Sequence, residues 1–479
     1  MPRTVPDPGT RGDRRVAMLT IGIDVGTSTV SGVVYDTETE EVKASVTVPG
    51  SQYLLTEVPG GAEQSTGLLL TAVREVLEAL EQQAPGAGAI AFSTQMHGMV
   101  YIDRDLHPLS PLITWEDKRA DRPAAEGVGS AGAAGGLSLA EQISDLTGYP
   151  TSTGYALATH VYNMRHGLVP EGVWKMVTAG DYCAMRLCKD GGPAGVRGPV
   201  MHPQTAASFG LFSVYEGCFD EIALDILDIT GVILPEVGEY GLAGYTEDGK
   251  AVFFSMGDNQ AGFTGAAGEQ GDILINVGTS AQISAVLETH GRSVSIAREL
   301  DLRPYIGSRF LVTGAALAGG SVLRSLNTFL IDVIHSVAPD LRIGADELYG
   351  LMDRLAEEAY GAGRAARVDT RFSGTRTDPE LRGSITGIGM DGLNLGSLCA
   401  GFYYGIVKEL YDFYCLMPRE IREQARRVIL TGNAARKNPI LRRIAEDLFG
   451  METVVSPRTE DAAVGAARYA AMCMEHTRE

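Results

Sequence analysis

The chain reads Ile21-Gly22-Ile23-Asp24-Val25-Gly26-Thr27-Ser28 near its start, and a similar stretch in its second half reads Ile273-Leu274-Ile275-Asn276-Val277-Gly278-Thr279-Ser280. Asp24 and Asn276 are 252 positions apart, a little over half of the 479 residues. Each stretch is a strand-like run that ends in the turn Gly-Thr-Ser. Because the flanking strand pattern recurs together with the turn, the sequence predicts two domains of similar fold.

The residues around the first turn predict further local structure. Apolar and β-branched runs predict three strands joined by short turns, over 19–24, 30–36 and 42–48. Helical spacing follows over 67–82, and a buried strand over 88–92. The domain therefore begins with a meander and not with a strand–helix–strand unit.

The composition is that of a globular chain with a core, with 44% hydrophobic and 21% charged residues. The 40 basic and 60 acidic residues give a net charge of −20, which argues against nucleic acid and anionic membrane surfaces as partners. No apolar run approaches the ~20 residues of a membrane span. None of the six cysteines forms a C-x-x-C pair, so we expect free thiols and a cytoplasmic protein. The oligomeric state stays open, with a homodimer as one option.

The two turns have the chemistry of a phosphate site. Gly26 and Gly278 have no Cβ, so a phosphate can approach their backbone amides closely. Hydroxyl groups lie beside these glycines on Thr27, Ser28, Thr279 and Ser280. Asp24 can hold a hydrated Mg²⁺ that bridges nucleotide phosphates, whereas the second copy has Asn276. The alternative is a pair of ordinary hairpin turns. A P-loop motif and a G-x-G-x-x-G motif after a strand are both absent from the sequence, so a nucleotide would bind in neither kind of site.

The duplicated turn resembles the two phosphate loops of the sugar kinase, Hsp70 and actin superfamily. From Leu19 to its last helix, the chain resembles the FGGY carbohydrate kinases. The resemblance implies an α/β fold of two ribonuclease-H-like (actin-like ATPase) domains that flank a deep catalytic cleft holding ATP and a sugar. We expect a flexible leader over 1–18, a sugar-binding domain over 19–262 with the catalytic base at its end, and an ATP-binding domain over 263–479.

Two segments of the first domain resemble motifs of the family. Residues 93–98 are similar to S-G-Q-M-H-G, which implies that Gln95, Met96 and His97 contact the substrate. Residues 115–119 resemble W-x-D-x-R. Trp115 can stack on a sugar, but we expect it in the core, and we expect Asp117 and Arg119 to form a local salt bridge.

The strongest catalytic candidate lies in residues 254–262, shortly before the second turn. A carboxylate held after a short strand by a glycine turn can accept the proton of an attacking hydroxyl. The match to the family motif G-D-N-x-x-G implies that Asp258 is the base and that Asn259 contacts the sugar. The alternative is that Asp258 only caps the helix that follows.

Two later glycine segments are candidates for nucleotide contacts. Gly319 and Gly320 open a helix predicted over 321–330, where they either admit a flat ring or only allow a tight helix entry. The resemblance implies that the loop at Gly432 and Asn433 binds adenosine. A helix should follow, capped by Asn438 and stopped by Gly450.

The resemblance implies ATP- and Mg²⁺-dependent phosphorylation of the terminal hydroxyl of a ketose. Residues 114–117, 204–210 and 302–305 are most similar to family members that act on sedoheptulose, with xylulose or another sugar or polyol as the alternative. Two other classes share the turns: an actin- or Hsp70-like ATPase, and a sugar-sensing protein without kinase activity. We identify neither a client-binding module of the kind that an Hsp70-like ATPase needs nor a helix-turn-helix that a sugar-sensing repressor would use, so we favour the kinase.

Overall fold

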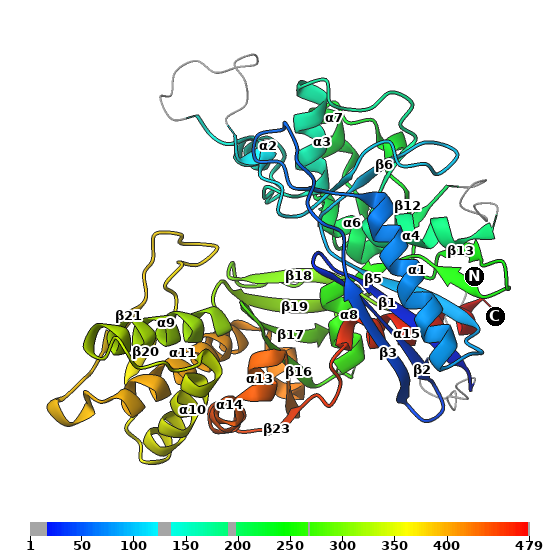
Figure 1. The fold of residues 1–479 in the computed structure, drawn as a ribbon. Coiled ribbons are helices and arrows are strands. Elements are labelled where there is room, and N and C mark those ends of the chain that lie inside the picture. The colour runs from blue at the N-terminus through cyan, green and yellow to red at the C-terminus, as the bar shows by residue number, and fades with distance from the viewer. Residues whose placement is uncertain (1–16, 123–135, 190–197, 267–268, 478–479) are drawn as a thin grey trace. The chain divides into compact units, whose positions relative to one another are not determined.

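The computed structural model describes residues 17–122, 136–189, 198–266 and 269–477. It divides into two compact units, shown in Figure 1. Unit 1 comprises residues 1–212, 219–262 and 462–479, and unit 2 comprises residues 213–218 and 263–461. Residues 1–16 of the expected leader lie outside the described residues. Met18 is described, and its amide donates to Thr37 Oγ1 at 3.0 Å.

The main sheet of unit 1 has the strand order β13-β14-β5-β1-β2-β3, and β15 also pairs with β5. Its strands are β1 (Leu19–Val25), β2 (Thr29–Asp36), β3 (Glu41–Pro49), β5 (Ala89–Thr94), β13 (Leu242–Tyr245), β14 (Ala251–Phe253) and β15 (Met256–Gly257). Strands β1, β2 and β3 are antiparallel neighbours, whereas β5 is parallel to β1, β14 and β15. The predicted meander and the predicted buried strand are therefore confirmed.

Two helices cover opposite faces of this sheet (Figure 1). Helix α1 (Thr66–Gln83) buries Leu69, Val73 and Leu80, and Ser65 caps its start. Helix α15 (Asp461–His476) packs on the other face, where Thr20 Oγ1 donates to the carbonyl of Ala467 at 2.8 Å. Side chains alternate along a strand, so neighbouring residues of β1 face different helices. The expected division assigned residues up to 479 to the second domain, whereas α15 packs within unit 1.

The other α-helices and strands among the described residues of unit 1 are short. They are β4 (Glu63–Gln64), β6 (Val100–Ile102), β7 (Leu112–Ile113), α2 (Leu139–Thr147), α3 (Ala156–Arg165), β8 (Lys175–Val177), α4 (Ala179–Leu187), β9 (Val200–Met201), α6 (Pro203–Phe209), α7 (Glu221–Ile226) and β12 (Glu236–Val237). Three further elements cross the division between the units along the chain: β10 (Phe212–Ser213), β11 (Cys218–Phe219) and α8 (Asp258–Ala266).

The sheet of unit 2 repeats the pairing pattern of unit 1, with the order β18-β19-β17-β16-β22-β23. Its strands are β16 (Asp272–Val277), β17 (Ala281–Leu287), β18 (Leu300–Tyr305), β19 (Arg309–Ala316), β22 (Arg427–Thr431) and β23 (Glu452–Val455). Strand β16 is antiparallel to β17 and parallel to β22, as β1 is to β2 and β5. The sequence repeat is thus a structural repeat, as predicted.

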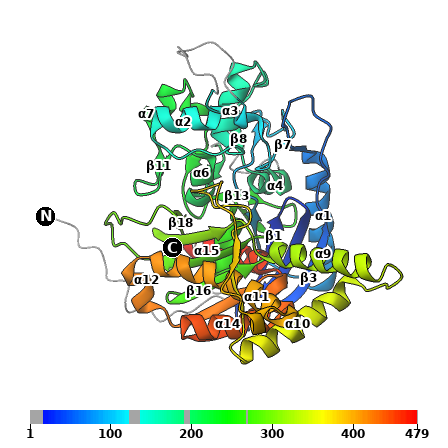
Figure 2. The same cartoon turned by 90° about the vertical axis from the view of Figure 1, so that its left-hand side faces the viewer.

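Helices pack around the core of unit 2, and Figure 2 shows α10, α11 and α14 side by side. The remaining α-helices and strands among the described residues of this unit are α9 (Gly320–Val337), α10 (Ala345–Gly361), β20 (Arg367–Asp369), β21 (Ser384–Thr386), α11 (Leu395–Leu416), α12 (Arg419–Gln424), α13 (Asn433–Lys437) and α14 (Pro439–Phe449). Helix α9 continues to Val337, past the predicted end at residue 330. Helix α14 begins after Asn438 and ends at Gly450 as predicted, but the Asn438 amide donates to Ala434 O and does not cap α14. Across the described residues, no helix combines the length and apolar character needed to cross a bilayer.

Candidate functional site

One edge of the unit 1 sheet collects the first group of predicted site residues. Strands β1, β5 and β15 are parallel, so their carboxyl ends lie at the same edge. In the register, Asp24 is opposite Ser93 and Ser93 is opposite Met256. Neighbouring strands are ~4.8 Å apart, which puts the backbones of β1 and β15 about 10 Å apart with β5 between them. Asp24, the segment after β5 and Asp258 therefore share one edge.

The first turn is held by contacts that the sequence did not predict. The Gly26 amide donates to Thr29 O at 3.1 Å, so it closes the turn and is not presented to a ligand. Gln64 Nε2 donates to the Thr27 carbonyl at 2.9 Å. No backbone acceptor among the described residues bonds to the amides of Thr27 and Ser28. The Gly26 amide is therefore already used within the turn, contrary to the expectation that it would be presented to a phosphate.

Trp115 is not part of the core, contrary to expectation, because 47% of its surface is exposed. Its Nε1–H donates to Thr27 Oγ1 at 2.9 Å, and Thr27 Oγ1 lies 3.5 Å from Gln95 Oε1. The Thr27 hydroxyl therefore links the turn to the segment after β5. The predicted salt bridge is confirmed, since Arg119 Nε lies 2.8 Å from Asp117 Oδ1 and both side chains are buried.

The Gln95–His97 segment bends sharply after β5. Gln95 is buried, and its amide donates to Val25 O at 3.0 Å. Met96 lies over Gly257, where a Cβ would come within 2.4 Å of its sulfur. His97 has a left-handed backbone (φ 73°), and its ring stacks on Tyr155 with centroids 4.4 Å apart. The segment thus comes into contact with the turn that precedes Asp258.

The His97 ring is oriented by α6. His97 Nδ1 lies 2.8 Å from the Ser208 carbonyl, and the His97 amide donates to Ser208 Oγ at 3.2 Å. A carbonyl only accepts, so Nδ1 carries the proton in this contact. Ser208 is 111 residues away from His97 in the chain, so the sequence did not predict this contact. The only signal was the resemblance of residues 204–210 to the family.

Asp258 begins α8 directly after β15, as the motif implied. It is half-buried, and its Oδ1 accepts from the Asn259 amide at 2.7 Å. The preceding backbone is fixed by two buried side chains that the sequence analysis did not assign. Gln204 Oε1 accepts from the Gly257 amide at 3.2 Å, and Asp181 Oδ1 accepts from the amide of Ser255 at 2.8 Å. Burial raises the pKa of Asp181 to about 6.

The second group of predicted residues lies at the equivalent edge of the unit 2 sheet. Gly278 N–H donates to Ser280 O at 2.9 Å, so this turn also uses its glycine amide internally. The Gly319 and Gly320 amides donate to Thr279 O and Gly278 O at 3.0 and 2.8 Å. A Cβ on Gly319 would lie 2.5 Å from Ser280 O. These glycines pack the start of α9 against the turn, which is the tight helix entry given above as the alternative.

Gly432 brings the third segment to the same edge. Strand β22 is parallel to β16, with Thr431 opposite Asn276. Gly432 has a φ of 88°, and a Cβ there would lie 2.5 Å from both Asn276 Oδ1 and Val277 O. Asn433 follows as the first residue of α13. The structure thus gathers the Gly-Thr-Ser turn, the start of α9 and the Gly432 loop within unit 2.

The residues present fit a magnesium ion at Asp24. Its carboxylate is half-buried at the edge of the sheet, and Oδ1 accepts from Ser93 Oγ at 2.6 Å. Mg²⁺ keeps several waters and takes one or two carboxylates together with phosphate oxygens, so one such side chain suffices.

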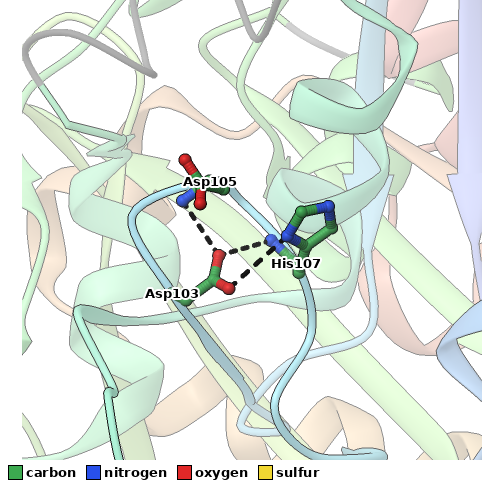
Figure 3. Close-up of side chains that lie close together, drawn as sticks. All are labelled: Asp103, Asp105 and His107. Atoms are coloured by element: carbon green, nitrogen blue, oxygen red, sulfur yellow. Dashed lines mark hydrogen bonds and ion pairs between the residues drawn. The ribbon is translucent and has the colours of Figure 1, made fainter.

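A second carboxylate cluster, Asp103, Asp105 and His107, has its possible ligand atoms within 4.8 Å of one another (Figure 3). Asp103 Oδ1 accepts from the amides of Asp105 and His107 at 2.9 and 2.8 Å, and Oδ2 lies 3.5 Å from His107 Nδ1. Asp103 therefore closes a turn, and this turn accounts for the proximity of the three side chains without a metal.

Family models match both halves of the chain. The model for the N-terminal domain of the FGGY family of carbohydrate kinases matches residues 19–256, and the model for the C-terminal domain matches residues 273–474. Among curated proteins, the sedoheptulokinases of Mus musculus and Homo sapiens are each 26% identical to the chain and cover 94% of it and 96% of their own length. The xylulose kinase of Lactococcus lactis is 24% identical, covering 94% of this chain and 87% of that protein.

Solved structures share the fold. Gluconate kinase from Lactobacillus acidophilus superposes with a TM-score of 0.75 at 21% identity, covering 97% of this chain and 91% of that one. Ligand-bound xylulose kinase from the same organism gives a TM-score of 0.74 at 20% identity, with coverages of 96% and 90%. The two-domain α/β architecture expected from the sequence is therefore confirmed.

Proposed function

Because the chain belongs to the FGGY family of carbohydrate kinases, and so is a phosphotransferase with an alcohol acceptor, we propose that it transfers the γ-phosphoryl group of ATP to the terminal hydroxyl of sedoheptulose. The observation that carries the choice of sugar is the agreement in length with the two sedoheptulokinases. They align over 96% of their length, compared with 86–88% for the gluconokinases and for the xylulose kinases of Lactococcus lactis and Staphylococcus epidermidis. Xylulose is the second candidate, supported by several xylulose kinases at 24–25% identity.

In this proposal Asp258 accepts the proton of the sugar's terminal hydroxyl. The sugar oxygen then forms a bond to the γ-phosphorus, the bond from this phosphorus to the β,γ-bridging oxygen breaks, and ADP leaves with that oxygen. Such transfer depends mostly on positioning and on neutralising charge, so one base is sufficient. Support for this role comes from the anchored position of Asp258, whose preceding turn is fixed by Gln204 and covered by Met96.

The sugar and the nucleotide have separate sets of candidate residues. Gln95, Met96, His97 and Asn259 would bind the sugar, and all four belong to unit 1. The turns at Thr27 and Thr279 would bind phosphates through amides and hydroxyls, and the Gly432–Asn433 loop would bind adenosine. Mg²⁺ held by Asp24 would neutralise phosphate charge when it is bound.

The test is sugar-dependent release of ADP across neutral ketoses with five, six and seven carbons, together with polyols and gluconate. We expect the highest kcat/KM for sedoheptulose. A higher value for xylulose or gluconate would reassign the substrate within the family. ADP release that is equal with and without every sugar would refute the proposed activity.

A further inference from the structure

Unit 1 contains a pocket of about 680 Å³ that the proposed catalytic residues do not line. Its wall includes Tyr53, Leu54, Trp115, Glu116, Lys118 and Thr153. The two aromatic rings are exposed to similar extents, 48% for Tyr53 and 47% for Trp115. Small-molecule sites typically occupy ~300–1,000 Å³, so the pocket has room for a ligand larger than a few atoms. We call it the Tyr53–Trp115 pocket.

The Tyr53–Trp115 pocket borders the candidate sugar site through two contacts. Trp115 Nε1 donates to Thr27 Oγ1 at 2.9 Å, and the same hydroxyl lies 3.5 Å from Gln95 Oε1. Gln95 begins the segment proposed to bind the sugar. One threonine side chain therefore connects the indole of the pocket to that segment.

The charges of the pocket favour a neutral ligand. Glu116 and Lys118 are both exposed at its wall and carry opposite charges, so their charges cancel. The Tyr53 hydroxyl donates to the Glu116 carboxylate. Burial, with a smaller contribution from Glu116, raises the pKa of Tyr53 to about 12, so the hydroxyl stays protonated at neutral pH. A ligand with its own carboxylate would meet Glu116 as well as Lys118, so its charge would gain no net attraction in the pocket.

The side chains also match the two surfaces of a sugar chain. Hydroxyl groups can donate to the Glu116 carboxylate and accept from the Lys118 ammonium group. The flat faces of Tyr53 and Trp115 can pack on the C–H groups of the same chain. These features together suit a polyhydroxyl chain and do not suit an apolar molecule or an anion.

On the basis of the proposed function, we propose that the Tyr53–Trp115 pocket holds the part of a neutral sugar chain that lies beyond the reacting hydroxyl, and that Glu116 thereby selects long ketoses over short ones and over aldonates. A pentulose would leave the pocket partly empty. A heptulose would fill more of it and gain contacts with Glu116. Gluconate would carry its carboxylate toward that of Glu116.

The test uses the Glu116→Gln variant, which removes the charge and keeps an acceptor for the Tyr53 hydroxyl. We expect KM for sedoheptulose to rise roughly 10-fold to 100-fold, the loss typical of a hydrogen bond to a charged group, with kcat changed less than about 3-fold. KM for xylulose should change less than about 3-fold, and KM for gluconate should fall. The matched control is Glu78→Gln, which removes the same charge from an exposed position on α1.

A binding measurement separates this inference from the proposed activity. The chain has two tryptophans, so Trp174→Phe leaves Trp115 as the single indole emitter. In that background, sedoheptulose should change Trp115 fluorescence, and Glu116→Gln should weaken its binding where Glu78→Gln does not. Equal binding in the two Glu variants would overturn the pocket assignment, as would equal loss for xylulose and sedoheptulose. Sugar binding without ADP release in the wild-type chain would refute the kinase assignment, and the fluorescence comparison would still decide the role of Glu116.

Discussion

Replacing Gly432 with alanine should weaken ATP binding and leave sugar binding unchanged, because the added Cβ forces the loop after β22 away from the second turn. The backbone at Gly432 has a φ of 88° and a ψ of 159°, a conformation that is essentially restricted to glycine and costs a residue with a Cβ ~1–3 kcal/mol. The new Cβ would also lie 2.5 Å from Asn276 Oδ1 and from Val277 O. Overpacking of this kind costs ~1–3 kcal/mol. The total loss of unfolding free energy should be about 2–6 kcal/mol.

Gly450 provides a matched control in the same unit. It also has a positive φ, 63°, but a Cβ there would meet nothing within 4 Å. Gly450→Ala should therefore carry only the cost of the left-handed conformation, ~1–2 kcal/mol. The two glycines differ in ψ, 159° at Gly432 and 26° at Gly450, so the difference between the variants measures the close contacts of Gly432 together with its less accessible backbone conformation.

Urea denaturation measures the stabilities, and steady-state ADP release at varied ATP and saturating sugar measures KM for ATP. We expect Gly432→Ala to raise this KM roughly 10-fold, equivalent to ~1.4 kcal/mol, with KM for the sugar unchanged. Gly450→Ala should keep both constants. The reasoning fails if the two variants are equally stable, or if Gly432→Ala binds ATP as well as Gly450→Ala does.

Two further substitutions test unit 1. Asp258→Asn keeps an oxygen that accepts from the Asn259 amide, so the variant should fold and bind sugar. Its kcat should fall by about 10²–10⁴-fold, as expected for removal of a general base. A kcat near that of the wild type would contradict this role. Asp181→Asn tests the buried carboxyl whose pKa is raised to about 6. Because the folded state binds this proton more tightly than the unfolded state does, the wild-type chain loses stability as the pH rises from ~4 to 6. The wild-type chain should lose about 3 kcal/mol more than the variant over this interval in urea denaturation, and parallel pH profiles would refute the assignment.

The repeated strands could be predicted from the sequence because their signal is local. Alternating apolar residues and a short turn define the limits of a strand and the strand that follows it, so β1 and β2 were predicted correctly, and β16 and β17 repeat their pairing. The pairing of β1 with β5 and of β16 with β22 then follows the same plan in both units.

The residues that hold the site were harder to predict because their partners lie far away in the sequence. Ser208 orients His97 from 111 positions away, and Gln204 fixes Gly257 from 53 positions away. Trp115 was expected in the core because large aromatic residues are mostly buried, yet its indole N–H has a partner at the edge of the sheet. The glycine amides were expected to face a ligand, but a turn can use its own amides, and this use depends on backbone geometry that residue types alone do not give.

The contacts of Thr27 connect the two kinds of ligand thermodynamically. Its carbonyl accepts from Gln64, and its hydroxyl contacts both Trp115 and Gln95, so the turn proposed to bind phosphate and the wall of the Tyr53–Trp115 pocket share one residue. A sugar that orders Trp115 would also order the turn at Thr27 through their hydrogen bond. The turn would then lose less conformational entropy when a phosphate binds to it. By linkage, the factor by which the sugar tightens nucleotide binding must equal the factor by which the nucleotide tightens sugar binding. If both proposed sites hold, Thr27 would couple the binding of the two substrates.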